Sequence, residues 1–204
     1  MTGSVDAVVF DVGGVLVDWH PDYLYRSLIP DDAQRHQFLT SICDDRWNLL
    51  QEAGQSLPAA VIELAGRYPQ HAELIAAWWT RWPEMLSDYD RDVLHLARRL
   101  QANGVALYAI TNWSAETWPR AIERFGFLDD LFIDAVISGQ EHVTKPDPEI
   151  FHILSRRNNL DVTTALFVDD SPVNTAAAAA LGYLPHTFTS AEALEAELAG
   201  YQLL

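Results

Sequence analysis

The sequence has few cysteines and few cations, and it lacks a long apolar run. Cys43 is its single cysteine, which excludes an internal disulfide bond. There are 13 lysine and arginine residues against 29 acidic residues, for a formal net charge of −16. This balance, without a basic patch, argues against a nucleic-acid partner, because such binding depends on cations that neutralise phosphates. No apolar run approaches the roughly 20 residues of a membrane span, so we expect no membrane partner.

The N-terminus also lacks the pattern of a signal peptide, and we therefore expect a cytoplasmic protein. At 204 residues, the chain is long enough for one domain with an insertion or a small second domain. Its content of 49% hydrophobic and 21% charged residues is typical of a globular protein. We expect a monomer or a homodimer.

The most informative stretch lies near the start and reads VVFDVGGVLVD. Its apolar run, Val8 to Phe10, predicts a buried parallel strand that ends at Asp11. Gly13 and Gly14 follow, and glycine permits a tight turn with close approach of the backbone. A carboxylate at the carboxyl end of a strand lies where open α/β sheets bind their ligands. A plain capping role for Asp11 is the alternative.

Three further polar groups stand at or near the ends of predicted elements. They are Thr111 and Asn112 after the strand 105–110, Lys145 before a helical pattern, and Asp169 and Asp170 after the strand 165–168. Each group has an ordinary alternative as a turn former, a surface lysine or a helix cap. Their recurrence at successive strand ends favours a shared site. Adjacent acids repel each other, and a divalent cation would explain their pairing.

The four motifs together closely resemble those of the haloacid dehalogenase-like hydrolase superfamily, in the branch with a helical cap after the first motif. The resemblance covers nearly the whole chain. Within it, FDVGGVLVDWHP, ITNWSAE and FVDDSPVN are similar to a bacterial group of such hydrolases. It implies an Mg²⁺-dependent hydrolase, most simply a phosphatase that acts on a small phosphorylated metabolite through an aspartyl-phosphate intermediate.

The remaining pattern predicts an α/β fold with a helical insertion. From residue 88 onward helices and strands alternate, which is typical of a parallel sheet. From about Pro21 to Ser87 no strand is predicted, and the apolar spacing indicates amphipathic helices. We expect a three-layer, Rossmann-like catalytic core with a parallel sheet at residues 1–17 and 88–204, and an α-helical cap at 18–87. The expected strands are 5–10, 105–110, 134–138, 165–168 and 184–187.

The resemblance implies that Asp11 is the nucleophile and also a ligand of Mg²⁺. Asp170 and the backbone carbonyl of Gly13 are further implied ligands, and Asp169 would act directly or through water. Mg²⁺ prefers such hard oxygen ligands.

The resemblance also implies a phosphate site. Thr111 would donate a hydrogen bond to a phosphate oxygen, with Asn112 nearby. Lys145 would offset the repulsion between Asp11 and an anionic substrate, which is electrostatic catalysis by a charge already in place.

The first motif departs from the usual phosphatase pattern. Phosphatases of this superfamily usually carry a second acid two positions after the nucleophile, which protonates the leaving group and then activates water. Gly13 stands there and has no side chain to titrate. Asp18 and His20 follow. Histidines in general suit acid–base work near neutrality, but a hinge residue between core and cap is the favoured interpretation of His20. Because general acid–base catalysis contributes roughly 10²–10⁴-fold, we expect a slow enzyme that favours good leaving groups.

The missing acid also leaves open a 2-haloacid dehalogenase, in which Asp11 would attack carbon without a metal. Such enzymes do not usually keep an acidic pair like Asp169 and Asp170. A dehalogenase would also need a cationic clamp for its substrate carboxylate, and Arg26 and Arg46 are the available arginines. The acidic pair favours metal and phosphate.

A third interpretation is a binding protein with degenerate catalysis on the same fold. Its sole support is the missing acid at Gly13. The presence of Asp11, Thr111, Lys145 and Asp170 argues against it.

Tryptophan is concentrated in the expected cap and beside two motifs. Trp19 and Trp113 each adjoin a motif and are candidates, with His20, for the wall of a substrate pocket. Such walls favour a small, partly apolar or sugar-like substrate over a macromolecule. We expect the other aromatic side chains of the cap to be mostly core, because their burial dominates packing energetics. They include Trp47, Trp78, Trp79 and Trp82.

Overall fold

A computed structural model describes residues 4–204 and contains a five-stranded parallel sheet. β1 pairs in parallel with β4 on one side and with β6 on the other, so it lies at the centre of the order β5-β4-β1-β6-β7. The predicted parallel α/β sheet is confirmed, and predicted and observed strands differ only at their ends. The strands are β1 (Ala7–Phe10), β4 (Ala106–Thr111), β5 (Asp134–Ile137), β6 (Ala165–Asp169) and β7 (Leu184–Thr187).

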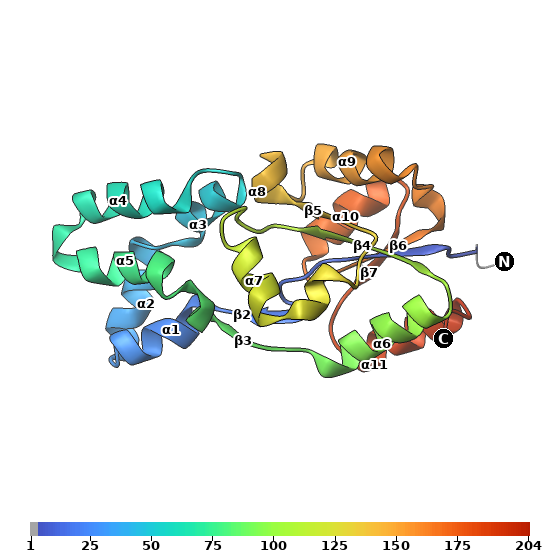
Figure 1. The fold of residues 1–204 in the computed structure, drawn as a ribbon, viewed down its shortest axis with the longest axis horizontal. Helices are drawn as coiled ribbons and strands as arrows, with labels where there is room; N and C mark the ends of the chain where they lie inside the picture. Colours follow the sequence, from blue (N-terminus) through green and yellow to red (C-terminus); the bar gives the residue numbers. More distant parts are fainter. Residues whose placement is uncertain (1–3) are drawn as a thin grey trace.

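Helices cover both faces of this sheet, which gives the three layers that the sequence predicts (Figure 1). Val8 and Phe10 belong to the buried cluster on the face of α6, α7 and α11, whereas Val9 belongs to the cluster on the face of α9 and α10. All residues of β1 are buried, which explains why its sequence is an uninterrupted apolar run. These helices are α6 (Arg91–Ala102), α7 (Trp118–Arg124), α9 (Pro148–Asn158), α10 (Pro172–Ala180) and α11 (Ala191–Gly200).

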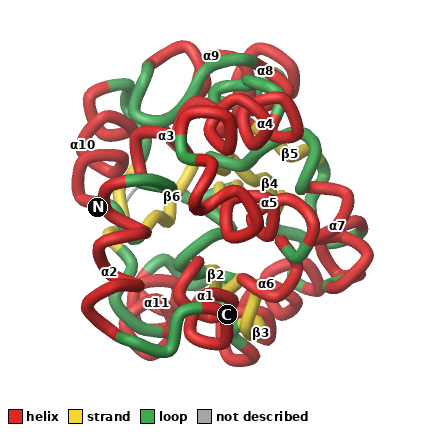
Figure 2. Tube along the Cα trace, turned by 90° about the vertical axis from the view of Figure 1, so that its left-hand side faces the viewer, coloured by secondary structure: helices red, strands yellow, loops and turns green. Residues whose placement is uncertain are grey.

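The helices between β1 and β4 that precede α6 form a separate group, which we call the helical segment (residues 21–85). They gather at the end of the molecule away from the N-terminus (Figure 1). Its elements are α1 (Pro21–Leu28), α2 (Asp32–Ser41), α3 (Asp45–Glu52), α4 (Leu57–Arg67), α5 (Ala72–Thr80) and the 3-10 turns η1 (Pro69–His71) and η2 (Trp82–Met85). Figure 2, from a perpendicular direction, shows strands surrounded by helices.

The interior of the helical segment is aromatic, as the sequence predicts. The buried rings of Trp47 and Trp78 meet edge to face with centroids 5.2 Å apart, and Tyr25 lies 6.0 Å from Trp78. Trp79 is only partly buried, and the guanidinium of Arg120 lies 3.6 Å from its ring centroid. Arg120 belongs to α7. This contact therefore joins the helical segment to the rest of the described chain, residues 4–20 and 86–204, which we call the sheet-bearing part.

A short antiparallel pair, β2 (Val17–Trp19) with β3 (Leu86–Tyr89), connects the two ends of the helical segment to the sheet-bearing part. The sequence predicts no strand here, and that expectation is wrong for Leu86 and Ser87. The strands are too short for a two-residue period to emerge, and their register shifts between Val17 and Trp19. The expected boundaries at 17/18 and 87/88 both fall inside this pair.

A carboxylate from the sheet-bearing part starts helix α4. Oε1 of Glu116 accepts a hydrogen bond from the Ser56 hydroxyl at 3.0 Å, and Oε2 accepts one from the Leu57 amide at 2.6 Å. Ser56 is the N-cap of α4 but makes no side-chain cap bond itself, so Glu116 satisfies a helix-end donor in its place. The contact holds α4 against the loop after β4.

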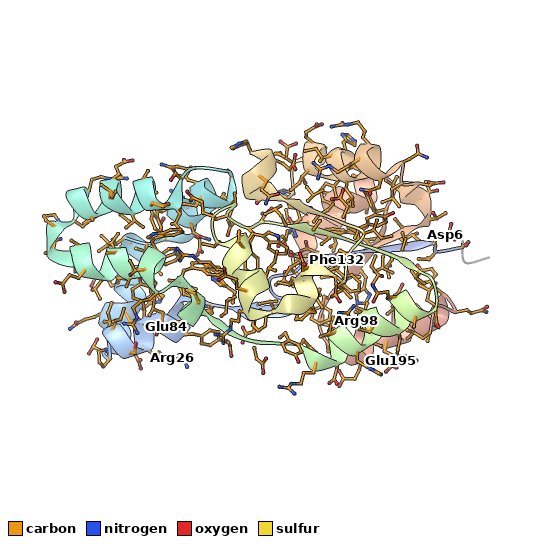
Figure 3. All side chains as sticks on the ribbon, viewed as in Figure 1. Asp6, Arg26, Glu84, Arg98, Phe132 and Glu195 are labelled. Carbon is orange, nitrogen blue, oxygen red and sulfur yellow. The ribbon has the colours of Figure 1, made fainter. Side chains whose placement is uncertain are left out.

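The remaining elements are α8 (Ser138–Glu141) and the 3-10 turns η3 (Gly126–Asp129) and η4 (Val162–Thr164). Figure 3 places Arg26 and Glu84 in the helical segment and Arg98 and Glu195 on α6 and α11, with many side chains between these groups. Across residues 4–204, no helix combines the length and apolar character that a membrane crossing needs.

Candidate active site

Asp11 comes directly after the central strand, at the carboxyl edge of the sheet. Its amide donates to the carbonyl of Val168 at 2.8 Å, which continues the β1–β6 ladder by one residue. Its Oδ1 accepts a hydrogen bond from the Val12 amide at 2.7 Å. Because β4 and β6 flank β1, polar residues at their ends approach Asp11 from both sides.

Lys145 connects the two sides of this edge. Its Nζ lies 2.8 Å from Oδ2 of Asp11 and 2.7 Å from Oδ2 of Asp169, and it donates to the carbonyl of Ile110 at 2.9 Å. The side chain is 1% exposed. The structure therefore brings Lys145 to Asp11, as the sequence predicts, and not to the surface.

Asn112 holds the backbone of Lys145. Its Oδ1 accepts from the Lys145 amide at 2.8 Å, and its Nδ2 donates to the Lys145 carbonyl at 3.1 Å. The amide thereby fixes the loop between α8 and α9 to the end of β4. This geometry gives Asn112 a positioning role beside the catalytic one expected from the sequence.

Asp11, Asp169 and Asp170 form an acidic cluster in which one oxygen from each carboxylate lies within 4.8 Å of the others. Asp169 is fully buried, and its Oδ1 accepts from the Ser171 amide at 2.8 Å in addition to the bond from Lys145. Asp170 is exposed to solvent. Gly14 has a φ of +76°, and a Cβ there would lie 2.5 Å from Oδ2 of Asp170. Glycine thus permits the close approach of the first and fourth motifs.

The cluster holds more negative charge than its single lysine neutralises. Burial raises the pKa of Asp11 despite the opposing effect of Lys145, and the nearby Asp169 raises it further. Although Asp170 is exposed overall, partial burial of its carboxyl raises its pKa, again with a contribution from Asp169. Burial would lower the pKa of Lys145, but the two carboxylates that it touches raise it overall. Converging carboxylate oxygens that are short of positive charge fit a hard divalent cation such as Mg²⁺.

Thr111 is the last residue of β4, beside the central strand. Its hydroxyl is buried, and it has no hydrogen-bond partner among residues 4–204. Buried hydroxyls are normally paired with a hydrogen-bond partner. Because the Thr111 hydroxyl has none in the described part of the chain, it is available to bind a ligand at the sheet edge.

A cavity of about 430 Å³, its open mouth included, lies between the sheet edge and the helical segment. Gly13 and Asn112 contribute from the sheet side. The walls are largely aromatic, and Trp19 and Trp113 line it as the sequence predicts. The tryptophans are Trp19, Trp78, Trp82 and Trp113.

His20 does not line this cavity. Its Nδ1 accepts from the Asp22 amide at 3.1 Å and so caps the start of α1. It faces a separate hollow in the helical segment, which Arg46 also lines. Arg26 is exposed and pairs with Asp22. Among the described residues, the cavity walls therefore contain no arginine that could clamp a carboxylate.

Glu52 is a titratable residue of the cavity that the sequence analysis did not single out. It ends α3, and its Oε1 accepts from Nδ2 of Asn48 at 2.6 Å. Burial raises the pKa of Glu52 to about 7; the Asn48 hydrogen bond opposes this, and the charge of Asp11 adds to it. In the sequence Glu52 is one acid on a polar helix, and only the packing of α3 over the sheet edge distinguishes it.

Comparison with known proteins gives a family match and a similar protein of known activity. A family model for haloacid dehalogenase-like hydrolases matches residues 5–182. A sesquiterpene phosphatase from Aspergillus oryzae is 26% identical over 182 residues, which is 89% of each chain.

Solved structures share the fold. A HAD family enzyme from Bacteroides thetaiotaomicron, in complex with magnesium and inorganic phosphate, has a TM-score of 0.72 at 21% identity and covers 91% of this chain and 95% of its own. The L-2-haloacid dehalogenase from Xanthobacter autotrophicus, with covalently bound chloropropionic acid, has a TM-score of 0.64 at 18% identity. The match covers 98% of this chain and 84% of the dehalogenase chain. At these identities, the likeness establishes the fold alone.

Proposed function

Because the chain belongs to the haloacid dehalogenase-like hydrolase family, we propose that it is an Mg²⁺-dependent phosphatase that acts on a small phosphorylated metabolite. The observation that carries this proposal is the acidic cluster of Asp11, Asp169 and Asp170 around the buried Lys145. A phosphatase needs a nucleophile, neutralising charge and a fixed geometry, and this cluster offers all of them.

Asp11 is the proposed nucleophile. Its carboxylate attacks the phosphorus atom, the alcohol leaves, and water then hydrolyses the aspartyl phosphate. The Val12 amide and the Lys145 ammonium each hold one of its oxygens, so its orientation is set before the substrate arrives. Lys145 offsets the negative charge of the phosphate, and the unpartnered Thr111 hydroxyl donates to a phosphate oxygen.

The proposed Mg²⁺ ligands are Asp11, Asp170 and the backbone carbonyl of Gly13, with Asp169 acting directly or through water. When bound, the cation neutralises charge on the phosphoryl group and helps to orient it. Asp169 is already engaged by Lys145 and the Ser171 amide, which favours an indirect role for it.

The helical segment is proposed to act as the cap that selects the substrate, with its expected limits at residues 18–87. Its tryptophans give an aromatic wall to the cavity, which Gly13 and Asn112 line from the sheet side. We infer a substrate whose organic group is at least partly apolar, and the similarity to a sesquiterpene phosphatase supports this inference. The expected cytoplasmic location and the choice between monomer and homodimer stay predictions.

Two observations favour the phosphatase over the dehalogenase. The acidic pair Asp169–Asp170 fits a metal site, and a metal-free attack on carbon does not require such a pair. The cavity walls also lack an arginine among the described residues, and Arg26 and Arg46 lie elsewhere. The same acidic pair and the buried Lys145 argue against a binding protein without catalysis.

The test is a phosphate-release assay on a panel of phosphate monoesters with Mg²⁺ and with EDTA, run beside a halide-release assay on 2-haloacids. We expect phosphate release that requires Mg²⁺. Metal-independent halide release, with no phosphate release, would replace the phosphatase by the dehalogenase.

Asp170→Asn should lose activity chiefly through lost Mg²⁺ affinity, because it removes a charged ligand but leaves Asp11 intact. At an Mg²⁺ concentration near 100 times its dissociation constant, the ion should stabilise the wild-type fold by about 2.7 kcal/mol. Thermal unfolding with and without Mg²⁺ measures this gain, which should shrink in Asp170→Asn. Asp129→Asn, on the exposed surface, is the matched control and should keep the full gain. An undiminished gain in Asp170→Asn would remove Asp170 from the ligand set.

A further inference from the structure

We propose that Glu52, from the helical segment, is the general acid and base of this site and replaces the acid that is missing at Gly13. The inference rests on the proposed phosphatase function. It adds a catalytic residue that belongs to a different part of the fold from the nucleophile.

The first argument is position. Glu52 and Gly13 line the same cavity, one from the end of α3 and the other from the turn after β1. Asn48 donates a hydrogen bond to Oε1 of Glu52, so Oε2 is the oxygen that we assign to proton transfer. A phosphate ester bound at Asp11 with its organic group in the cavity has its bridging oxygen between these two elements.

The second argument is that the backbone of Glu52 is fixed to the sheet-bearing part. The Ser138 hydroxyl donates to the Glu52 carbonyl at 2.6 Å and accepts from the Trp113 amide at 2.9 Å. One hydroxyl thus connects the end of α3 to the loop that follows the second motif. A group that transfers a proton must be held in place, and these bonds fix the backbone from which the Glu52 carboxyl extends.

The third argument is protonation. Burial raises the pKa of Glu52 to about 7, so both its acid and its base forms are populated near neutrality. The charged groups that act on it are Asp11 and Asp45, which raise the pKa, and Lys145, which lowers it. An acid that must give up a proton and then regain it works best in this range.

The chemistry balances with this assignment. As Asp11 forms a bond to phosphorus, the bond to the leaving oxygen breaks, and the Glu52 proton moves to that oxygen to give the alcohol. The Glu52 carboxylate then takes a proton from the water that attacks the aspartyl phosphate. Phosphate leaves, Asp11 returns to its carboxylate form and Glu52 to its acid form.

The space at Gly13 allows a decisive test. Its φ lies outside the left-handed region, and a Cβ built there would meet only Cζ3 of Trp113, at 3.8 Å. An aspartate at residue 13 therefore fits the backbone and points into the cavity that Glu52 lines. If Glu52 supplies the missing proton, an acid at residue 13 should take over when Glu52 is removed.

The experiment compares Glu52→Gln with the wild type on two substrates of similar size, benzyl phosphate and p-nitrophenyl phosphate, with Mg²⁺. Benzyl alcohol is a poor leaving group that needs a proton, whereas p-nitrophenolate leaves without one. We expect kcat/KM to fall about 10²-fold on benzyl phosphate and to stay within about threefold on p-nitrophenyl phosphate. In the wild type, the ionisation of Glu52 should cause kcat/KM on benzyl phosphate to fall at higher pH. This fall should disappear in Glu52→Gln. The ratio of the two rates does not depend on the folded fraction of a preparation.

Glu52→Gln with Gly13→Asp should regain at least about tenfold on benzyl phosphate. Glu63→Gln changes an exposed acid on α4 that pairs with Arg67; it is the matched control and should keep the wild-type ratio. An unchanged ratio in Glu52→Gln, with an active wild type, overturns the role of Glu52 alone. If the wild type releases no phosphate from either substrate in Mg²⁺, the proposed function fails, and the role of Glu52 fails with it.

Discussion

Replacing Asp11 by asparagine will lower kcat by at least about 10⁴-fold, the scale at which loss of a nucleophile acts. The amide cannot form the aspartyl phosphate, and it also removes one charged ligand of the acidic cluster. Steady-state phosphate release with Mg²⁺, on p-nitrophenyl phosphate, measures the effect. This substrate is chosen because it depends least on proton transfer, so the loss reports the nucleophile.

The Asp11→Asn protein should remain folded. Lys145 keeps its partner Asp169 at 2.7 Å, and the Val12 amide can still donate to the asparagine oxygen. Its melting temperature without Mg²⁺ should therefore stay near that of the wild type. Asp129→Asn serves again as the surface control and should keep full activity. Residual activity above about 1% of the wild type would assign the nucleophile to another residue.

Replacing Lys145 by methionine will cost about 3–5 kcal/mol of unfolding free energy, because it leaves buried carboxylates without their cation. Asp169 is 0% exposed at its side chain and Asp11 is 10% exposed, so solvent cannot compensate. Activity should fall as well, since Lys145 is the side-chain cation that offsets repulsion between Asp11 and the phosphate. Urea unfolding at neutral pH without Mg²⁺ measures the stability change.

The pH dependence of this loss has a definite sign. In Lys145→Met the pKa of Asp11, already raised by burial, rises further. A carboxyl with a raised folded-state pKa stabilises the fold below its unfolded pKa, and that contribution is lost as pH rises through the folded value. The deficit relative to wild type should therefore be larger at about pH 8 than at about pH 5.

Arg99→Met is the matched control for the lysine substitution. Arg99 pairs with Glu195 at 2.7 Å, but its side chain is 39% exposed. Removing this cation should cost no more than about 1 kcal/mol, as for exposed ion pairs in general. Equal losses in the two variants would contradict the idea that burial makes Lys145 essential.

The sequence predicts those parts of the site that lie at the ends of buried strands. Apolar runs locate β1, β4 and β6, and a parallel sheet brings their carboxyl ends to one edge, so Asp11, Thr111 and Asp169 had to be neighbours. Lys145 follows no strand directly, and its place depended on the resemblance to a family motif. The structure adds the physical cause, which is the pair of hydrogen bonds between the Asn112 side chain and the Lys145 backbone.

The contributions of the helical segment could not be read in the same way. Glu52 has the spacing of any solvated acid on a helix, and its place over the sheet edge depends on how α3 packs. His20 adjoins the first motif in sequence, yet β2 and the start of α1 carry it away from the cavity. His20 is close to the first motif along the chain but lies outside the cavity. Glu52 is far from that motif along the chain but lines the cavity.

The burial of Lys145 also determines how the protein responds to amine chemistry. Lys145 is the only lysine in the sequence, and the remaining basic side chains are arginines and histidines. Acylating or methylating reagents thus have one side-chain target, which is 1% exposed and enclosed by two carboxylates. Modification at this residue requires the site to open, so its rate reports the frequency of opening. A single isotope-labelled lysine would give a spectrum with one resonance, placed at the nucleophile.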